Sequence, residues 1–199
     1  MKLNKVCKRC VMDTSDPDIY FDEQGNCNNC NTFLEEVKII MPKGKKRENK
    51  FQELLKKIKS KGKNNKYDCL IGMSGGVDST YLAHLLKQNN LRPLAMHMDN
   101  GWNSKIAVKN IMNICTKLEI DYVSKVLDWE EFKNIQLAFL KSSIVEVEMP
   151  TDHAIAGSLH QVASKYNIKY IIGGGNYSTE GILPQKWFYD PKDLVLIKS

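Results

Sequence analysis

The fold of this 199-residue chain follows from one stretch, Cys69-Leu70-Ile71-Gly72-Met73-Ser74-Gly75-Gly76-Val77-Asp78-Ser79-Thr80. Its apolar first half has the length and composition of a buried parallel strand. Beyond it, Tyr81, Leu82, Leu85 and Leu86 recur at helical spacing. The two glycines therefore lie at a strand-to-helix turn, where free backbone N–H groups and the positive end of a helix dipole can bind phosphate. The alternative interpretation is an ordinary tight turn.

The loop lacks the lysine of the G-x-x-x-x-G-K-[ST] pattern and does not fit the G-x-G-x-x-G dinucleotide pattern. It instead resembles the SGGxDS signature of the PP-loop ATP pyrophosphatase superfamily, whose members cleave ATP to AMP and pyrophosphate and so adenylate a carbonyl oxygen. This resemblance implies a sheet of the adenine nucleotide alpha hydrolase type. It also implies that ATP is bound by Ser74, Gly75, Gly76, Val77, Asp78 and Ser79.

The rest of the chain after residue 66 alternates apolar runs with helical periodicity. We expect strands over Tyr67–Met73, Arg92–Met98, Asp121–Val126 and Lys169–Ile172, and helices over Asp78–Gln88, Ser104–Lys117, Glu130–Ser142 and Asp152–Tyr166. Such alternation indicates an α/β fold with a parallel sheet covered by helices on both faces. Ligands of these sheets bind at the carboxyl ends of the strands, where Ser74–Ser79, Met98–Trp102 and Gly173–Glu180 would converge.

Four cysteines form a separate pattern near the N-terminus, Cys7-x2-Cys10 and Cys27-x2-Cys30, with sixteen residues between the pairs. This spacing is typical of a tetrahedral zinc site with four thiolate ligands. The segment between the pairs is polar and rich in turns, so metal binding would supply the stability that its small core cannot. We interpret it as a zinc ribbon; two unrelated redox pairs are the alternative.

Composition places these parts in an ordinary globular protein, with 42% apolar and 26% charged residues. We expect a zinc ribbon over residues 1–41, a basic linker or helix over 42–66, and a C-terminally incomplete PP-loop domain over 67–199. The net charge of +6 is concentrated in the linker, where a solvated helix face is favoured over nucleic-acid binding. The absence of a signal-peptide pattern and of a long apolar run predicts a cytoplasmic protein without membrane contact.

Further site residues follow from the PP-loop resemblance. The end of the second strand, at Met96, His97 and Met98 with Asp99 just beyond, would cradle the adenine. The loop from Gly173 to Asn176 would close over the ribose and phosphates. The resemblance makes Asp78 a magnesium ligand, and Glu180 is the candidate to share the ion. A solvated loop carboxylate explains Glu180 equally well.

Three further strings narrow the resemblance. They are Cys7-Lys8-Arg9-Cys10-Val11-Met12-Asp13-Thr14-Ser15-Asp16-Pro17, Pro150-Thr151-Asp152-His153-Ala154-Ile155, and Gly173-Gly174-Gly175-Asn176 followed by Thr179-Glu180-Gly181-Ile182-Leu183-Pro184. Together with the loop they resemble the N-acetyl sugar amidotransferases of bacterial surface-polysaccharide, lipopolysaccharide and nonulosonic-acid biosynthesis. Members of that family are usually longer, so this chain resembles an N-terminal portion.

The family resemblance implies a specific reaction. ATP would adenylate the acetamido oxygen of an N-acetyl sugar, and ammonia would then displace AMP to give an acetamidino sugar. Ammonia would come from a glutaminase partner resembling the histidine-pathway glutamine amidotransferase. The expected cofactors are ATP, Mg²⁺ and Zn²⁺.

Asp152 and His153 lie at the expected start of a helix, where they could orient the sugar or shuttle a proton. Asp152 could equally be a helix cap. Trp102 and Trp187 could line the pocket or belong to the core, and Lys186 could contact a phosphate or lie on the surface.

Two other functions stay open. Transfer-RNA thiolation enzymes also join cysteine pairs to a PP-loop, and the basic segment over residues 43–66 would then bind RNA. Only Cys69 and Cys115 lie outside the ribbon, and neither belongs to a C-x2-C pair, so we expect this reading and nucleic-acid binding to fail. A non-catalytic remnant that binds nucleotide is the third possibility.

Overall fold

The computed structural model describes residues 4–143 and 146–184, which form two compact units. One unit, the cysteine unit, comprises residues 4–51 and 176–184 of the described chain. The other, the α/β unit, runs from Gln52 to Gly175. Lys186 and Trp187, for which sequence analysis proposed phosphate and pocket contacts, lie outside the described residues.

The α/β unit contains a parallel four-stranded sheet in the order β3-β2-β1-β4. Its strands are β1 (Cys69–Gly72), β2 (Pro93–Asp99), β3 (Tyr122–Val126) and β4 (Ile171–Ile172). The helices between them are α3 (Val77–Gln88), α4 (Lys105–Lys117), α5 (Trp129–Lys141) and α6 (Met149–Lys165). The α/β fold class with a parallel sheet is confirmed, with β4 reduced to two residues. The order reverses between β1 and β4, which creates a switch point where such sheets bind ligands.

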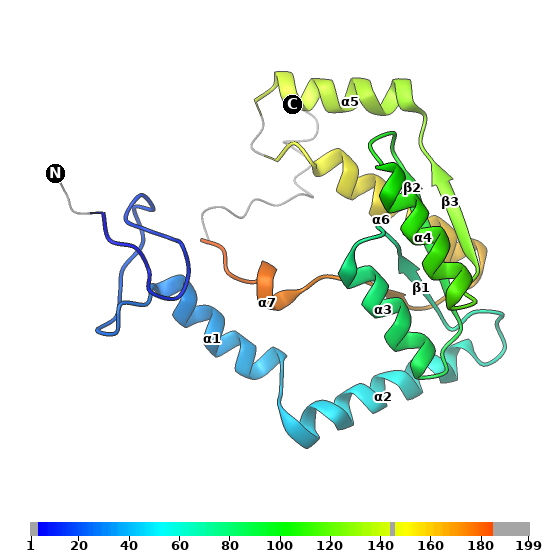
Figure 1. Ribbon diagram of the computed structural model, residues 1–199, viewed down its shortest axis with the longest axis horizontal. Coiled ribbons are helices and arrows are strands. Elements are labelled where there is room, and N and C mark those ends of the chain that lie inside the picture. The colour runs from blue at the N-terminus through cyan, green and yellow to red at the C-terminus, as the bar shows by residue number, and fades with distance from the viewer. Residues whose placement is uncertain (1–3, 144–145, 185–199) are drawn as a thin grey trace. The chain divides into compact units, whose positions relative to one another are not determined.

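Alternation along the strands buries both faces of the sheet. Leu70, Leu94 and Met96 pack with Val162 and Ala163 of α6 in one hydrophobic cluster. Their neighbours Ile71 and Ala95 are also fully buried and face the other side of the sheet. Figure 1 shows α3 and α4 on one side of the strands and α6 on the other. The resulting three-layer arrangement leaves the carboxyl edge of the sheet to loops.

An ion pair between the buried Asp68 and the half-exposed Arg92 joins the start of the sheet to the preceding helix α2 (Gly44–Gly62). The Asp68 carboxylate accepts hydrogen bonds from the backbone N–H, Nε and Nη2 of Arg92 at 2.8, 3.1 and 2.6 Å. Arg92 Nη2 also donates to the carbonyl oxygen of Gly62 at 2.9 Å. Because Asp68 is buried, these charge-assisted bonds offset its desolvation and fix the end of α2 against β1 and β2.

The cysteine unit has little regular structure. It contains isolated antiparallel bridges between Val6 and Asp13 and between Phe21 and Cys27. Two helices follow, α1 (Asn28–Ile40) and the four-residue α7 (Tyr177–Glu180). The expected small core is confirmed, since its cluster consists of buried cysteines packed against Ile19, Phe21 and Ile182.

Several boundaries differ from the sequence-based expectation. The helix α1 begins directly after Cys27 and includes Cys30. The helix expected from Asp152 begins at Met149, because Pro150 is tolerated in a first helical turn. Asp152 is therefore not a helix cap, and α7 was not predicted. No helix of the described chain is both long enough and apolar enough to cross a bilayer.

Candidate nucleotide site and metal centre

The loop from Ser74 to Gly76 is folded on itself at the end of β1. The Ser74 and Ser79 hydroxyls lie 3.1 Å apart, and the Gly76 N–H donates to Ser74 Oγ at 3.3 Å. The hydroxyls of Ser79 and Thr80 donate to the Gly76 carbonyl at 3.1 and 2.7 Å. The serines and Thr80 thus shape the loop and keep its backbone pointed in one direction.

Gly75 fits a place that no other residue can occupy without strain. Its φ is +78°, in the left-handed region that favours glycine. A Cβ there would lie 2.5 Å from the carbonyl oxygen of Ala107 in α4. Asn110 of the same helix donates to the Gly75 carbonyl at 3.4 Å. The contacts of Ala107 and Asn110 with Gly75 could not be predicted from the sequence, because helical periodicity does not report which loop a helix contacts.

The start of α3 offers an anion site beside this loop. Gly76 is the N-cap and provides no side-chain cap. In the part of the chain that the structure describes, the backbone N–H groups of Val77, Asp78 and Ser79 have no hydrogen-bond partner. Unpaired N–H groups at a helix start bind phosphate readily, assisted by the helix dipole. The six predicted loop residues are brought together here.

The loop after β4 approaches the same helix start. A Cβ on Gly174 would lie 3.5 Å from both the Cα and the N of Ser79. The predicted Gly173 precedes this contact and is exposed. Because β1 and β4 are neighbours in the sheet, the two glycine-rich loops meet at the switch point. The convergence expected for these two segments is therefore present in the α/β unit.

Two residues predicted to bind adenine, Met98 and Asp99, make contacts within the α/β unit. The side chain of Met98 packs in the core cluster with Met96, both on the α6 side. The Asp99 carboxylate accepts hydrogen bonds from the Gly101 N–H and from Asn103 Nδ2, both at 3.0 Å. These two bonds hold the pKa of Asp99 below its usual value. Both residues thus have clear structural roles, and their contact with adenine stays a prediction.

His97 lies on the other face of β2 and is buried. Its Nδ1 is 3.2 Å from the carbonyl oxygen of Met73, the residue before the loop. Its Nε2 is buried without a hydrogen-bond partner among the described residues. An unsatisfied buried nitrogen costs about 1–3 kcal/mol, so such atoms often mark positions for bound water or ligand.

Asp152 and His153 are exposed in the first turns of α6. Desolvation and the nearby carboxylates of Glu146 and Glu148 raise the pKa of Asp152. Two side-chain bonds connect this region to the loop after β2. Trp102 Nε1 donates to Gln136 Oε1 at 2.7 Å, and Gln136 Nε2 donates to Thr151 Oγ1 at 3.4 Å. Trp102 also packs edge-to-face on Trp129, with ring centroids 5.5 Å apart, and remains 67% exposed.

Asn176 and Glu180 belong to the cysteine unit, whereas Asp78 belongs to the α/β unit. Asn176 caps α7 by accepting from the Ser178 N–H at 3.2 Å. Glu180 accepts from the Asn176 N–H at 3.1 Å. Each side chain therefore stabilises the short helix, and the shared magnesium site with Asp78 stays a prediction.

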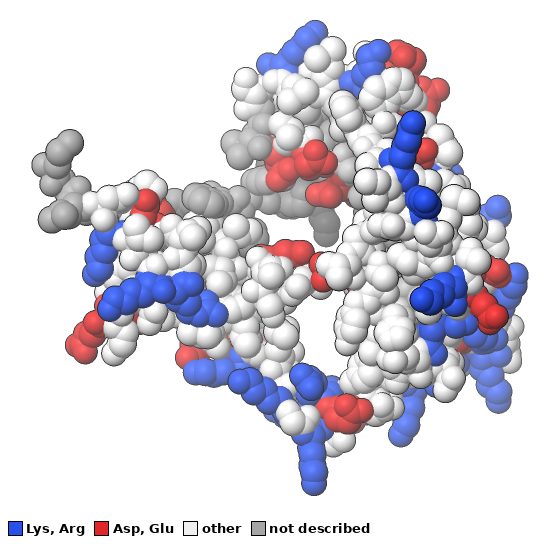
Figure 2. Space-filling model, viewed as in Figure 1, with Lys and Arg blue, Asp and Glu red and all other residues white. Residues whose placement is uncertain are grey.

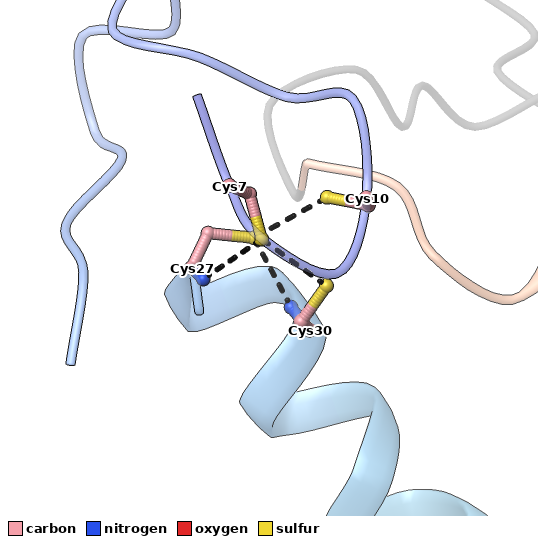
Figure 3. A group of neighbouring side chains, drawn as sticks. All are labelled: Cys7, Cys10, Cys27 and Cys30. Carbon is pink, nitrogen blue, oxygen red and sulfur yellow. Dashed lines mark hydrogen bonds between the residues drawn. The ribbon is translucent and has the colours of Figure 1, made fainter. Parts of the chain in front are cut away.

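The four cysteines near the N-terminus point toward one another (Figure 3). Their sulfurs all lie within 4.8 Å of one another, with Cys7–Cys30 at 3.8 Å and Cys10–Cys27 at 3.7 Å. Tetrahedral ligation with Zn–S bonds of about 2.3 Å separates sulfurs by about 3.8 Å. The spacing therefore fits one zinc ion, and it is far longer than the roughly 2.05 Å of a disulfide.

Backbone N–H groups support thiolates at this centre. Cys7 Sγ accepts from the N–H groups of Arg9 and Cys27 at 3.4 and 3.2 Å. Cys27 Sγ accepts from the Cys30 N–H at 3.4 Å as the cap of α1. Burial opposes ionisation of Cys7, but its backbone hydrogen bonds lower its pKa to about 6. Burial beside the other sulfurs raises the pKa of Cys10 to about 12.

Comparisons with known proteins support this geometry. The family model described as the tRNA methyl transferase HUP domain matches residues 67–148, from just before β1 to just before α6. Over these residues the α/β unit is similar to proteins of the PP-loop ATP pyrophosphatase type. The glutamine-dependent NAD⁺ synthetase from Acinetobacter baumannii in complex with ADP has a similar fold. Its TM-score is 0.53 at 15% identity, covering 66% of this chain and 26% of that chain.

Two curated relatives extend the comparison. An uncharacterized protein from Methanocaldococcus jannaschii is 27% identical over 173 residues, covering 84% of this chain and 58% of its own length. A tRNA-specific 2-thiouridylase from Fusobacterium nucleatum is 30% identical over 120 residues, covering 56% of this chain and 34% of its own. The chain thus spans less than two thirds of the length of these relatives. The superfamily uses ATP, and the cysteine cluster fits the zinc ribbon expected from the sequence.

Proposed function

We propose that this chain is an ATP-dependent enzyme that adenylates the acetamido oxygen of an N-acetyl sugar, so that ammonia can displace AMP. The observation that carries the ATP step is the meeting of two glycine-rich loops at the unpaired N–H groups of Val77, Asp78 and Ser79. That arrangement matches the chemistry of pyrophosphate, an anion with many acceptor oxygens.

The proposed reaction balances as two displacements. The acetamido oxygen attacks the α-phosphorus of ATP, and the bond to pyrophosphate breaks. Ammonia then attacks the activated carbon, AMP leaves with the oxygen, and loss of a proton gives the acetamidino sugar. The chain's own part is to position both substrates and to stabilise charge on the leaving pyrophosphate through its backbone N–H groups.

Asp78 is exposed in the first turn of α3, beside these N–H groups. Its carboxylate is a suitable ligand for Mg²⁺, which prefers oxygen donors and phosphate partners. When bound, Mg²⁺ would neutralise charge on the phosphate oxygens. The same carboxylate is also favourable at a helix N-terminus in the absence of metal. Substitution of Asp78 separates its role as a magnesium ligand from its role at the helix N-terminus, because only the magnesium ligand is needed for pyrophosphate release.

The choice of an acetamido group rests on the three sequence strings that resemble the N-acetyl sugar amidotransferases. Two of these strings contain residues of the sites described above, namely Cys7, Cys10 and Gly174. The proposal includes a separate glutaminase partner as the source of ammonia. It places the reaction in the biosynthesis of a bacterial surface polysaccharide or a nonulosonic acid.

A second candidate is transfer-RNA thiolation, which the name of the Fusobacterium relative favours. The helix α2 carries eight Lys or Arg residues against two Glu, and the blue side chains of Figure 2 include this basic stretch. Such a helix could bind an RNA backbone. However, Cys69 and Cys115 are both buried, and burial raises the pKa of each, that of Cys69 to about 12. Neither thiol is suited to carry sulfur as a reactive thiolate.

The deciding experiment incubates the protein with ATP, Mg²⁺, ammonium and a set of nucleotide-linked and free N-acetyl sugars. We expect pyrophosphate release and a sugar product about 1 Da lighter, the mass change from acetamido to acetamidino. Asp78→Ala should abolish the release. Glu130→Ala is the matched control, since Glu130 is also an exposed acid in a first helical turn, that of α5. Product formed only on transfer RNA would support the second candidate and contradict the first.

A further inference from the structure

The segment from Asn176 to Ile182 is part of the cysteine unit although it follows β4 of the sheet directly. Ile182 packs against the buried cluster of Cys7, Cys27 and Cys30. Among the described residues, the other apolar side chains packed there besides Cys10 are Ile19 and Phe21. A ribbon with so few apolar groups depends on each of them, so Ile182 is a substantial part of its core.

Tyr177 makes a second connection to the metal centre. Its ring stacks on Phe33 with centroids 5.4 Å apart, and its hydroxyl donates to Glu36 at 2.5 Å. The guanidinium of Arg9 lies 5.2 Å from the same Phe33 ring, and its Nη1 donates to Cys30 Sγ at 3.7 Å. A continuous set of contacts thus leads from a ligand sulfur through Arg9 and Phe33 to Tyr177.

Gly181 shows how closely the segment follows α1. A Cβ at this position would lie 2.6 Å from the Tyr177 carbonyl oxygen and 2.8 Å from the Phe33 ring. The helix α7 has only four residues, too few for stability by itself. Besides its capping by Asn176 and Glu180, its conformation therefore depends on the contacts with Phe33 and the cysteine cluster.

The other end of the segment reaches the nucleotide loop through the chain itself. One peptide bond joins Asn176 to Gly175, and Gly174 is the residue that approaches the backbone of Ser79. Glycine-rich loops have little intrinsic preference for one conformation. Residues 173–175 therefore lie between the contact of Gly174 with Ser79 and the start of the cysteine unit at Asn176.

We propose that the metal held by the four cysteines fixes the conformation of residues 176–182, and through them the nucleotide loop, with Tyr177 and Ile182 as positioning residues. The effect on nucleotide rests on the ATP site of the proposed function; the effect on the segment does not. Coupling of two binding free energies is reciprocal. Bound nucleotide should consequently slow the release of the metal.

Hydrogen–deuterium exchange of the full chain, followed by mass spectrometry of peptides covering 176–183, tests whether the metal fixes the conformation of this segment. We expect zinc removal by a chelator to speed exchange there by at least about tenfold, while peptides of β1 and β2 keep their protection. Tyr177→Ala and Ile182→Ala should speed the same exchange while retaining one zinc. Tyr20→Ala, a control in the same unit with a ring that is 70% exposed, should change nothing. Unchanged exchange both after chelation and in Tyr177→Ala overturns the proposal.

The coupling between the metal and the nucleotide loop is tested with a non-hydrolysable ATP analogue and Mg²⁺. We expect Tyr177→Ala to raise the Kd by about fivefold or more, and the analogue to slow zinc transfer to a chromogenic chelator in the wild type. A loosened segment with unchanged Kd and unchanged zinc release overturns the coupling to nucleotide. No binding of the analogue by the wild-type protein contradicts the ATP site itself, and the exchange experiment still decides the role of the metal.

Discussion

At the scale of single residues, Gly75 and its neighbour Gly76 serve different purposes. Gly75 combines a positive φ with contact against the α4 backbone, whereas Gly76 has an extended conformation with φ −82° and caps α3. An ordinary residue could adopt the conformation of Gly76, but its Cβ would lie near the Ser74 hydroxyl, at 3.4 Å. The loop therefore requires glycine more strictly at position 75 than at position 76.

We predict that Gly75→Ala destabilises the protein by at least about 2 kcal/mol, because the left-handed conformation and the overlap with Ala107 both oppose a methyl group. ATP binding should be lost with it, since α4 must shift. Thermal denaturation and calorimetric titration with ATP measure the two effects.

Gly157→Ala is the matched control for this substitution. Gly157 lies in α6, and a Cβ there would meet nothing within 4 Å. Alanine is the better helix former by about 0.5–1 kcal/mol, so this variant should be as stable as the wild type or more so. Equal stability of the two variants would contradict the tight packing of Gly75.

Asp152 has a pKa raised by desolvation and by Glu146 and Glu148, so its charged form is disfavoured in the folded state. The folded protein then binds this proton more tightly than the unfolded chain, and stability falls as the pH rises through the two pKa values. Asp152→Asn should therefore raise Tm at pH 7, by no more than about 2 °C for an exposed group, and by less at pH 3.

The same variant bears on the proposed reaction. If Asp152 orients the sugar or moves a proton, Asp152→Asn should lower kcat while the protein becomes slightly more stable. A pH-independent gain in Tm would contradict the assigned electrostatic cause. Unchanged kcat would show that Asp152 is not a catalytic residue.

At the scale of elements, the two cysteine pairs reach one point by different means. Cys7 and Cys10 lie in a loop closed by the bridge between Val6 and Asp13. Cys27 and Cys30 lie at the start of α1, where one sulfur also caps the helix. A helix start suits thiolates because its N–H groups donate to sulfur and its dipole favours negative charge. Metal binding and the start of α1 should therefore form together.

We predict one zinc ion per chain after anaerobic purification, and loss of that zinc in Cys30→Ser, measured by elemental mass spectrometry. The physical reason is the sulfur spacing of 3.7 and 3.8 Å, which suits a single tetrahedral ion. Cys115→Ser should keep its zinc, since Cys115 is a buried thiol of α4 outside the cluster. Metal-free wild-type protein, or iron in place of zinc, would contradict the assignment.

At the scale of the whole molecule, the strand order decides which loops lie side by side at the carboxyl edge of the sheet. β4 lies on the opposite side of β1 from β2, so the loops after β1 and β4 leave the sheet side by side. A ligand bound there contacts the α/β unit at two separate loops. Its binding should therefore stabilise the whole fold of that unit.

We predict that ATP with Mg²⁺ raises Tm by about 5–10 °C at a concentration 100 times its Kd, which corresponds to about 2.7 kcal/mol. Adenosine, which lacks the phosphates, should give a much smaller shift, because the unpaired N–H groups of α3 bind phosphate. Differential scanning calorimetry measures both shifts. Equal shifts with ATP and adenosine would contradict a phosphate site at the loop.

Much of the fold could be predicted because it depends on local patterns. The apolar run before Ser74 and the helical spacing after Thr80 placed the loop between β1 and α3, and alternation along the chain indicated the parallel sheet. The spacing of the four cysteines indicated their cluster, since two C-x2-C pairs restrict the possible geometries severely. Each of these inferences needed only residues close together in sequence.

Other features did not follow from periodicity or spacing. The helix expected from Asp152 begins three residues earlier, at Met149, because a first helical turn accepts Pro150. Met98 packs in the core and Asp99 is hydrogen-bonded within its loop, and the predicted contact of both residues with adenine stays a prediction.

The sequence by itself therefore determined the α/β class, the glycine turn between β1 and α3, and the cluster of four cysteines. Only the tertiary structure decided that α4 closes on Gly75, that Gly174 meets the start of α3, and that residues 176–182 complete the core around the cysteines. The reason is physical. Periodicity and spacing report the local conformation of the backbone, whereas Tyr177 and Ile182 pack against residues more than a hundred positions away, where no local pattern constrains them.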